Sequence, residues 1–254
     1  MLNIVDRLWA IHNDPSSNDG HTISAQVDPG IDLRGGQELQ LQLLQRWLDT
    51  GERIGGWKIG MTSGASRNAM GEGVRPFGFI LESRIKTAAD KLSVAKLHRG
   101  QVENELCFLF GHTIGAGATA NDARAAVSHV LPAFEINQKR LPPGAPTGLR
   151  IADNLSNWGI CIGEPVAPPS QLNDLTVAIF DENKLIETVS SVGHIDDHYE
   201  SLAALARSLS EHGHTISPGQ YVITGAYGKT PFAPGIYTGQ FSDGIGEVKI
   251  NLVR

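Results

Sequence analysis

The chain has 254 residues, 41% of them hydrophobic and 19% charged, which is the composition of a globular protein with a substantial core. Its net charge of −6 comes without a basic cluster, so we expect neither nucleic acid nor anionic membranes as partners. No apolar run approaches the length of a membrane span, the N-terminus does not read as a secretion signal, and the two cysteines, Cys107 and Cys161, exclude a disulfide framework. These features predict a cytoplasmic protein with one main domain.

Hydrophobic periodicity and breaker residues predict an irregular alternation of helices and short strands. In chain order, the expected elements are a helix over 2–12, a helix over 37–50, a strand over 54–63, a strand up to 80 after a turn at 76–78, a strand from 106, a helix over 121–130, and strands over 131–136, 160–163, 175–180 and 185–189, then a helix over 199–211 and strands over 220–224 and 246–253. A polar, breaker-rich stretch over 13–21 is either a mobile lid or a connector.

Lys58 lies between Trp57 and Ile59 in the first expected strand, which is an apolar setting for a charge. A lysine held there needs an anionic partner, a substrate anion or a route to water along its own stem. If this strand lies at the edge of a sheet, Lys58 simply faces solvent, and the residues alone leave both interpretations open.

Glu103 and Glu105 stand at the head of an apolar run that begins at Leu106 and reads as a buried strand. Because successive strand side chains alternate between faces, both carboxylates point the same way, with α-carbons about 7 Å apart. Two like charges beside an apolar strand repel each other and are costly to desolvate, so a hard divalent cation between them is a candidate, as is a solvated polar face. A third carboxylate, Glu135, lies in the apolar strand expected over 131–136.

Two further patterns point to other ligands. The stretch Gly115-Ala116-Gly117-Ala118-Thr119-Ala120 imitates a dinucleotide-binding fingerprint, with Glu135 about twenty residues further on. Four residues separate it from the preceding strand, however, and a helix cap at Thr119 explains it equally well. His194 and His198 are four residues apart and would suit zinc on a helix, although no third ligand has suitable spacing.

Taken together and in order, several stretches resemble the fumarylacetoacetate hydrolase superfamily, and more narrowly its 2-keto-4-pentenoate hydratase and 4-oxalocrotonate decarboxylase branch. The resemblance spans about residues 37–252, and the ordered set is specific although each piece is weak. The matching pieces are GWKIGMTS at 56–63, MG and GV within 70–74, PFGFI at 76–80, VENE at 102–105, FEI at 134–136, ADNLS at 152–156 and ITG at 223–225.

The resemblance implies an α+β fold, in which a mixed β-roll core over 53–254 carries peripheral helices and a small helical cap over 1–52, together forming one catalytic domain. It also implies an active-site Mg²⁺ or Mn²⁺. The family's metal ligands fall on Glu103, Glu105 and Glu135, its lysine on Lys58 and its active-site serine on Ser156. Substrate contacts are implied at other positions of the matching stretches, namely Thr62, Ser63, Phe77, Gly78, Asp153 and Thr224.

The activity that the resemblance implies is a metal-dependent hydratase of 2-hydroxypenta-2,4-dienoate-type substrates in aromatic meta-cleavage catabolism. The alternatives are a 4-oxalocrotonate-type decarboxylase, an acylpyruvate-type C–C hydrolase, and a non-catalytic subunit that associates with a paralogous enzyme. For the hydrolase, His12 and His21 are the lid candidates. In each catalytic case the partner is a small 2-keto mono- or dicarboxylate, and family habit implies a homo-oligomer.

Three departures from the family pattern leave the general acid or base open. Arg75-Pro76 stands where many hydratases carry an acid. Gln138 replaces the acid that usually follows the third metal ligand, although Arg140 remains. Asp196-Asp197-His198 replaces a glycine-containing turn before the last helix. None of these changes touches the three glutamates, so they leave the exact substrate open but not the expected metal site.

Overall fold

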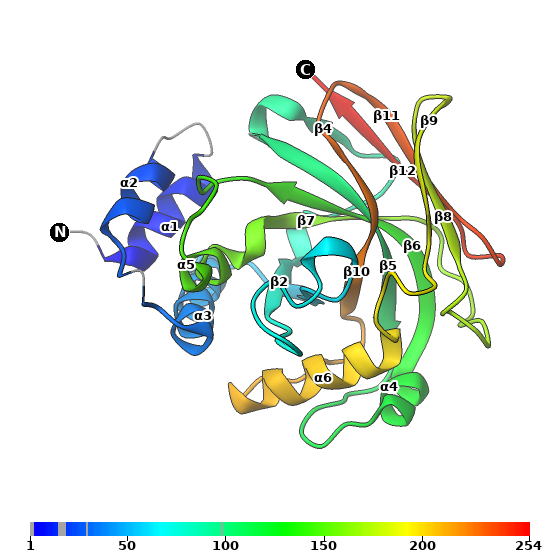
Figure 1. The fold of residues 1–254 in the computed structure, drawn as a ribbon, viewed down its shortest axis with the longest axis horizontal. Coiled ribbons are helices and arrows are strands. Elements are labelled where there is room, and N and C mark those ends of the chain that lie inside the picture. The colour runs from blue at the N-terminus through cyan, green and yellow to red at the C-terminus, as the bar shows by residue number, and fades with distance from the viewer. Residues whose placement is uncertain (1–2, 15–18, 29, 98) are drawn as a thin grey trace.

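The computed structural model describes residues 3–14, 19–28, 30–97 and 99–254. Within these residues, the chain forms a curled seven-stranded sheet and a five-stranded sheet, with helices arranged around their outer sides (Figure 1). This mixed, curled sheet with peripheral helices confirms the α+β fold class expected from the sequence.

The helices and strands have the following bounds. The helices are α1 (Ile4–Asn13), α2 (Asp19–Gln26), α3 (Leu33–Asp49), α4 (Ala120–Ala126), α5 (Thr147–Ala152) and α6 (His198–Glu211), and short 3-10 turns are η1 (Gly64–Ser66), η2 (Glu82–Arg84), η3 (Val94–Lys96) and η4 (Asn154–Ser156). The larger sheet has the order β2 (Phe77–Leu81), β1 (Ile54–Ile59), β10 (Tyr221–Pro231), β5 (Gly100–Phe110), β6 (Val127–Gln138), β7 (Asn157–Ile162) and β3 (Ile85–Lys86). The smaller sheet has the order β4 (Lys91–Ser93), β12 (Gly246–Val253), β11 (Gly235–Phe241), β8 (Thr176–Asp181) and β9 (Lys184–Ser190).

The long antiparallel pair of β5 and β6 forms the centre of the larger sheet. Its register sets Glu103 opposite Glu135, and Val102 opposite Ile136. The apolar residues along both strands are almost completely buried, with Phe108 fully so. Because a slip of one residue would turn every side chain to the other face, this burial fixes the register and with it the positions of the two glutamates.

Strand β10 lies beside β5 and is bent. It carries two extra residues relative to β5, one between Ile223 and Ala226 and one between Ala226 and Gly228. Extra residues of this kind bend a strand and increase its local twist. The sheet is therefore bent where β10 passes Glu105, the residue opposite Ala226.

The N-terminal helices α1, α2 and α3 gather with α5 on one side of the molecule, whereas α4 and α6 lie along another (Figure 1). Helix α3 can approach α5 closely because Gly36 has no Cβ. A Cβ at this position would lie only 2.4 Å from the carbonyl oxygen of Gly148. Gln40 of α3 then donates its side-chain amide to the carbonyls of Phe77 (2.9 Å) and Ile151 (2.8 Å), which ties α3 to β2 and α5. No helix in the described ranges is both long and apolar enough to cross a membrane.

The structure differs from the sequence predictions at several boundaries. The helix predicted over 121–130 ends at Ala126, because the next residues pair with β5 as the start of β6. Strand β5 begins at Gly100, so Glu103 and Glu105 lie within the strand and not at its head. Helices α2 and α5 and strand β11 were not expected. Part of the polar stretch over 13–21 lies outside the described residues, and its last residues begin α2.

Candidate metal centre

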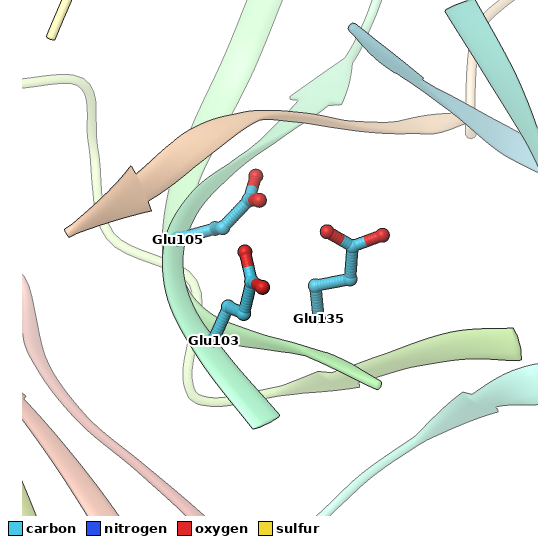
Figure 2. A group of neighbouring side chains, drawn as sticks. All are labelled: Glu103, Glu105 and Glu135. Carbon is cyan, nitrogen blue, oxygen red and sulfur yellow. The ribbon is translucent and has the colours of Figure 1, made fainter. Parts of the chain in front are cut away.

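Three carboxylates converge on one point at the centre of the larger sheet. Glu103 and Glu105 extend from β5, and Glu135 extends from β6 toward them (Figure 2). One oxygen of each lies within 4.8 Å of the other two, and in the described part of the chain no other group of His, Cys, Asp or Glu has this geometry. The structure thus brings together the three residues that the sequence indicated as metal ligands.

This convergence follows directly from the strand pairing. Glu103 and Glu105 share a face of β5 because they are two residues apart, and Glu135 faces Glu103 across the ladder. Directly opposed side chains on adjacent antiparallel strands have Cβ atoms about 4.5–5.5 Å apart, so the three carboxyl groups meet without any contribution from a loop.

Each carboxylate is held by a donor from a different neighbour. The backbone N–H of Gly225 donates to Glu105 Oε2 at 2.7 Å. The side-chain amide of Asn157 donates to Glu135 Oε1 at 2.8 Å, and Lys58 Nζ donates to the same oxygen. The side-chain amide of Gln101 donates to Glu103. The four donors are thus two side-chain amides, one backbone N–H and one ammonium group. These bonds orient the carboxylates and leave oxygens free to face one another.

The electrostatics of the cluster favour a bound cation. Burial, together with the nearby Glu135 carboxylate, raises the pKa of Glu105 well above its ordinary value and also raises the pKa of Glu103. Burial alone would lower the pKa of Lys58, but the surrounding carboxylates, led by Glu135, outweigh it and raise that pKa. Three carboxylates against one ammonium leave two negative charges in excess when all are ionised, which a divalent cation balances.

The donor set fits a hard divalent cation. Carboxylate oxygens are the ligands that Mg²⁺ and Ca²⁺ prefer, and with bonds of about 2.0–2.6 Å the oxygens around one ion lie up to about 4–5 Å apart. The spacing within 4.8 Å in this cluster falls in that range. The cluster therefore passes both tests, of ligand chemistry and of spacing, for one Mg²⁺-type ion.

The three glutamates line a cavity of about 260 Å³. Four of the other residues singled out from the sequence also line it, namely Lys58, Thr62, Ser63 and Ser156. Lys58 belongs to β1, the strand that pairs with β10 on the side away from β5, so it reaches the cluster across β10. Its expected anionic partner is Glu135, and the alternative of a solvent-facing lysine is wrong because Lys58 is only 6% exposed.

The remaining expected substrate contacts are not among the residues that line the described cavity, namely Phe77, Gly78, Asp153 and Thr224. Gly78 leaves room for the side chain of Lys58, since a Cβ on Gly78 would lie 2.8 Å from Lys58 Cγ. The carbonyl of Thr224 accepts a 2.6 Å hydrogen bond from Thr62 Oγ1. A direct contact of these four residues with substrate stays a prediction.

Ser156 reaches the cavity from a strained turn. Asn154, Leu155 and Ser156 all have positive φ, at 57°, 51° and 64°, and left-handed conformations of this kind are uncommon for residues other than glycine. The side chain of Asn154 holds the turn in place, because it accepts from the backbone N–H of Phe79 (2.8 Å) and donates to the carbonyl of Phe79 (2.9 Å). The sequence offered one signal for this role, since asparagine adopts left-handed φ more readily than most residues.

The zinc site considered for His194 and His198 is wrong. His198 is buried in α6, with Nδ1 2.7 Å from Thr224 Oγ1 and Nε2 2.8 Å from the hydroxyl of Tyr227, so both ring nitrogens are occupied. His194 lies outside that helix, with Nε2 3.1 Å from the carbonyl oxygen of Ala226. Burial lowers the pKa of His198 to about 4. This histidine thus anchors β10 as a neutral ring, a role that the sequence did not suggest.

The dinucleotide fingerprint is also wrong. Its helix, α4, connects β5 to β6, and these strands are antiparallel, whereas the fingerprint requires a parallel β-α-β unit. Thr119 is instead the N-cap of α4, in a capping box with Asp122, as the alternative interpretation predicted. Glu135, the acidic residue of the supposed fingerprint, belongs to the carboxylate cluster.

The departures from the family pattern form ion pairs beside the site. Arg75 pairs with Asp196 at 2.7 Å, and Arg67 pairs with the same carboxylate at 3.0 Å. Arg140 pairs with Asp153 at 2.7 Å and also donates a 2.9 Å hydrogen bond from Nη1 to Gln138 Oε1. None of these groups belongs to the described lining of the cavity.

His12 is not available as a lid residue. Its ring is buried, with Nε2 3.0 Å from Asp153 Oδ1, and burial together with the charge of Arg140 lowers its pKa to about 3. The other lid candidate, His21, is exposed on α2 and is not among the residues that line the described cavity. The two cysteines are buried, and burial raises the pKa of Cys161 to about 12 and raises that of Cys107 as well, which suits structural thiols and not nucleophiles.

Comparison with known proteins supports the family resemblance. No protein-family model matches the chain. It is 27% identical over 206 residues to a 4-oxalocrotonate decarboxylase of a Pseudomonas species, which covers 78% of each chain. It is also 27% identical over 199 residues to a 2-hydroxypent-2,4-dienoate hydratase of Pseudomonas putida, which covers 76% of this chain and 90% of the relative.

The fold matches a solved structure over almost its whole length. The structure of 4-oxalocrotonate decarboxylase from Pseudomonas putida G7, complexed with magnesium and adipate, aligns with a TM-score of 0.88 at 21% identity and covers 98% of this chain and 96% of that chain. This likeness confirms the fold that the resemblance implied. The sequence relatives in turn support the resemblance to the 2-keto-4-pentenoate hydratase and 4-oxalocrotonate decarboxylase branch of the fumarylacetoacetate hydrolase superfamily.

Proposed function

We propose that this protein is a divalent-metal-dependent hydratase, a carbon–oxygen lyase that adds water to 2-hydroxypenta-2,4-dienoate-type acids in aromatic meta-cleavage catabolism. The observation that carries the proposal is the convergence of Glu103, Glu105 and Glu135 in a cavity that also holds Lys58. The hydratases among its relatives support the same activity. Magnesium, present in the structural relative, is the favoured ion here, and Mn²⁺ is the alternative.

The residues of the cavity have separable roles in this proposal. Glu103, Glu105 and Glu135 would hold the ion, which when bound supplies a Lewis acid for the 2-oxo acid group. Lys58 brings a buried positive charge to the same place, so it is suited to binding the substrate carboxylate and to moving a proton. Ser156 is held by its rigid turn and is suited to positioning the substrate chain or the attacking water.

Replacing Glu135 with Gln tests the metal site. The change keeps the size of the side chain and removes one charged ligand, so we expect Mn²⁺ affinity and hydratase activity to fall at least about 100-fold, since even outer-shell partners of metal ligands contribute about 10–100-fold. Mn²⁺ binding is measured by the loss of its free-ion electron paramagnetic resonance signal, and activity by the decrease in dienol absorbance. Glu211→Gln, an exposed change at the end of α6, is the control. Unchanged Mn²⁺ binding in Glu135→Gln would overturn the ligand assignment.

A 4-oxalocrotonate-type decarboxylase is the second candidate, because a relative with that name aligns as well as the hydratase does. Both reactions use the same 2-oxo acid group and the same cation, so the cluster alone does not separate them. Release of CO₂ from oxalocrotonate, without hydration of a dienoate, would favour the decarboxylase. Lack of either reaction, with Mn²⁺ binding intact, would favour the non-catalytic subunit.

We also propose the organisation expected from the sequence, namely one catalytic domain over 1–254 made of the cap over 1–52 and the core over 53–254. Contacts between α3, α5 and β2 support this unit. Self-association, or association with a paralogous enzyme, remains a prediction that light scattering of the purified protein tests. The two free, buried cysteines suit the proposed cytoplasmic location.

A further inference from the structure

The turn that presents Ser156 is held at both ends by one buried guanidinium group. Arg140 Nη2 donates to the backbone carbonyl of Asp153 at 2.9 Å and to that of Asn157 at 3.2 Å. These two carbonyls belong to the residues immediately before and after the three with positive φ, Asn154 to Ser156. One side chain therefore contacts both flanks of the strained backbone.

The guanidinium group of Arg140 is itself fixed in a place closed to water. Its Nε donates to Asp153 Oδ1 at 2.7 Å and its Nη1 donates to Gln138 Oε1 at 2.9 Å. The side chains of Arg140 and Asp153 are 0% and 1% exposed, and a charge at such a depth is tolerated only when it is paired and hydrogen-bonded. Because the donors of arginine form a rigid planar fork, these bonds together fix where the two backbone carbonyls lie.

The helical cap adds a contact to the same carboxylate. His12 of α1 has Nε2 3.0 Å from Asp153 Oδ1, the oxygen that also accepts from Arg140. Since the pKa of His12 is lowered to about 3, the ring is neutral and contributes a hydrogen bond, not a second cation. His12 is outside the described lining of the cavity, so the cap contacts the turn from behind.

The Arg140 contacts also relate the turn to the metal ligands. Arg140 lies two residues beyond the end of β6, the strand that carries Glu135. The side-chain amide of Asn157 donates to Glu135 Oε1 at 2.8 Å, while the backbone carbonyl of Asn157 accepts from Arg140. Ser156, the residue before Asn157, lines the same cavity as Glu135. The position of the serine relative to the carboxylates therefore depends on contacts that start from one strand.

A turn of this kind needs anchors outside itself. Left-handed conformations of residues other than glycine persist only when the surrounding structure over-determines them. Asn154 provides an anchor at the start of the turn, through its two bonds to the backbone of Phe79, and Arg140 provides those on both flanks. Leu155 and Ser156 are only half-buried, so packing alone does not fix them.

We propose that Arg140 is a positioning residue, whose guanidinium group holds Ser156 in place relative to Glu135 by fixing the two flanks of its turn. The catalytic consequence rests on the proposed function, in which Ser156 positions the substrate chain or the attacking water. Arg140 is not part of the described cavity lining, so its effect on the reaction passes through the turn. Loss of the Arg140 contacts should misplace the serine and lower kcat, while the carboxylate cluster still binds its ion.

Arg140→Lys tests the contacts without leaving the Asp153 carboxylate unpaired. Lysine keeps the positive charge but lacks the fork that reaches a carboxylate and two carbonyls at once. Hydrogen exchange measures the result independently of activity, because the backbone N–H groups of Ser156 and Asn157 are both bonded within the turn. We expect peptides over 153–158 to exchange roughly 10-fold or more faster, as the loss of hydrogen bonds to a charged group implies.

Three comparisons separate a local effect from general loosening. Peptides of β5 should exchange as in the unmodified protein. Arg34→Lys, whose side chain is 82% exposed on α3, should change neither region. Asp153→Asn keeps the Oδ1 acceptor and removes the charge that holds Arg140, so it should loosen the same turn even if Arg140→Lys fails to fold. Unchanged exchange over 153–158, or an equal rise in β5, would overturn the positioning role.

A double-variant cycle with Ser156→Ala tests the catalytic consequence. We expect Arg140→Lys to lower kcat about 10-fold or more in the unmodified background. In the Ser156→Ala background it should lower kcat less than about two-fold, because the side chain through which it acts is absent. Mn²⁺ affinity should fall much less than kcat in Arg140→Lys, since all three ligands remain. Equal losses of kcat in the two backgrounds, or full activity of Ser156→Ala, would contradict this positioning role.

Failure of this inference is distinguishable from failure of the proposed function. If the unmodified protein binds Mn²⁺ but acts on neither a dienoate nor oxalocrotonate, the proposed function is overturned, and the catalytic part of this inference with it. Exchange over 153–158 then still decides whether Arg140 holds the turn. If the protein is active and Arg140→Lys leaves both exchange and kcat unchanged, only this inference is overturned.

Discussion

Gly225 shows how much the site depends on one backbone position. Its φ of +127° is strained for any other residue, its N–H donates to Glu105, and a Cβ there would lie 2.2 Å from Thr62 Oγ1. Glycine is therefore required for two independent reasons, the positive φ and the lack of space for a Cβ beside Thr62.

We expect Gly225→Ala to weaken Mn²⁺ binding about 10-fold or more, because the N–H that orients Glu105 must shift. The matched control is Gly213→Ala at the end of α6, where φ is +78° but no atom lies within 4 Å of the added Cβ. The control should lose about 1 kcal/mol of unfolding free energy from backbone strain alone, measured by urea denaturation, and should bind Mn²⁺ normally. Normal Mn²⁺ binding by Gly225→Ala would show that the Gly225 N–H does not orient a ligand.

Asn154 holds the strained turn that presents Ser156. Asn154→Ala removes both hydrogen bonds to the backbone of Phe79 in a fully buried place, so we expect a loss of about 2–4 kcal/mol of unfolding free energy. Asn183→Ala, in the exposed β8–β9 turn, should change stability by less than about 0.5 kcal/mol. Equal effects of the two changes in urea denaturation would mean that the turn does not need its side-chain anchor.

At the scale of elements, Gln40 connects the helical cap to the core. Gln40→Leu removes the donor shared by the carbonyls of Phe77 and Ile151 and keeps the bulk of the side chain. Leaving two buried carbonyls without a partner should cost about 2–4 kcal/mol. Gln45→Leu on the exposed face of α3 is the control and should be nearly neutral. Thermal denaturation of both variants measures the difference, and an unchanged midpoint for Gln40→Leu would show that the cap and core are joined by other contacts.

The sequence predicted elements well where local pattern and tertiary contact agree. The amphipathic helix expected over 199–211 is α6, which buries Leu202, Leu205 and Leu209. The helix expected over 121–130 stops at Ala126, because Val127 and Val130 pair with β5 and long-range pairing outweighs a helical continuation. Helix α5 was missed because its six residues follow a proline-rich loop and show no amphipathic repeat.

The sequence predicted the ligands of the candidate metal site but not the residues that hold them in place. Alternation along a strand was enough to put Glu103 and Glu105 on one face. The family resemblance, and not the spacing, added Glu135, since cross-strand register depends on contacts far apart in the sequence. The supporting contacts of Asn154 and His198 could not be predicted for the same reason, because their partners lie 75 and 26 residues away.

At the scale of the whole molecule, two buried histidines link stability to pH. Burial lowers the pKa of His12 to about 3 and that of His198 to about 4, whereas both titrate near 6.5 in an unfolded chain. Between about pH 6.5 and pH 4 the unfolded chain therefore binds more protons than the folded protein. The free energy of unfolding should fall as the pH drops through this window, by up to about 1.4 kcal/mol per pH unit for each histidine.

The contribution of His198 can be isolated by substitution. His198→Gln should be less stable at pH 7 because it loses the bonds to Thr224 and Tyr227, but its stability should depend less steeply on pH between 6.5 and 4. His129→Gln, an exposed change on β6, should keep the full slope. Urea denaturation at several pH values measures both slopes, and identical slopes in the two variants would contradict a neutral, buried His198.

The two extra residues of β10 have a consequence for anyone who wishes to transplant this centre into another scaffold. They bend the sheet beside Glu105, and the N–H of Gly225, which lies within the first irregularity, leaves the regular ladder and serves the carboxylate. A flat host sheet carrying only the three glutamates would reproduce the ligands without the curvature or the donor that aims one of them. A successful graft must therefore include the irregular neighbouring strand as part of the motif, and strand order then limits which hosts can accept it.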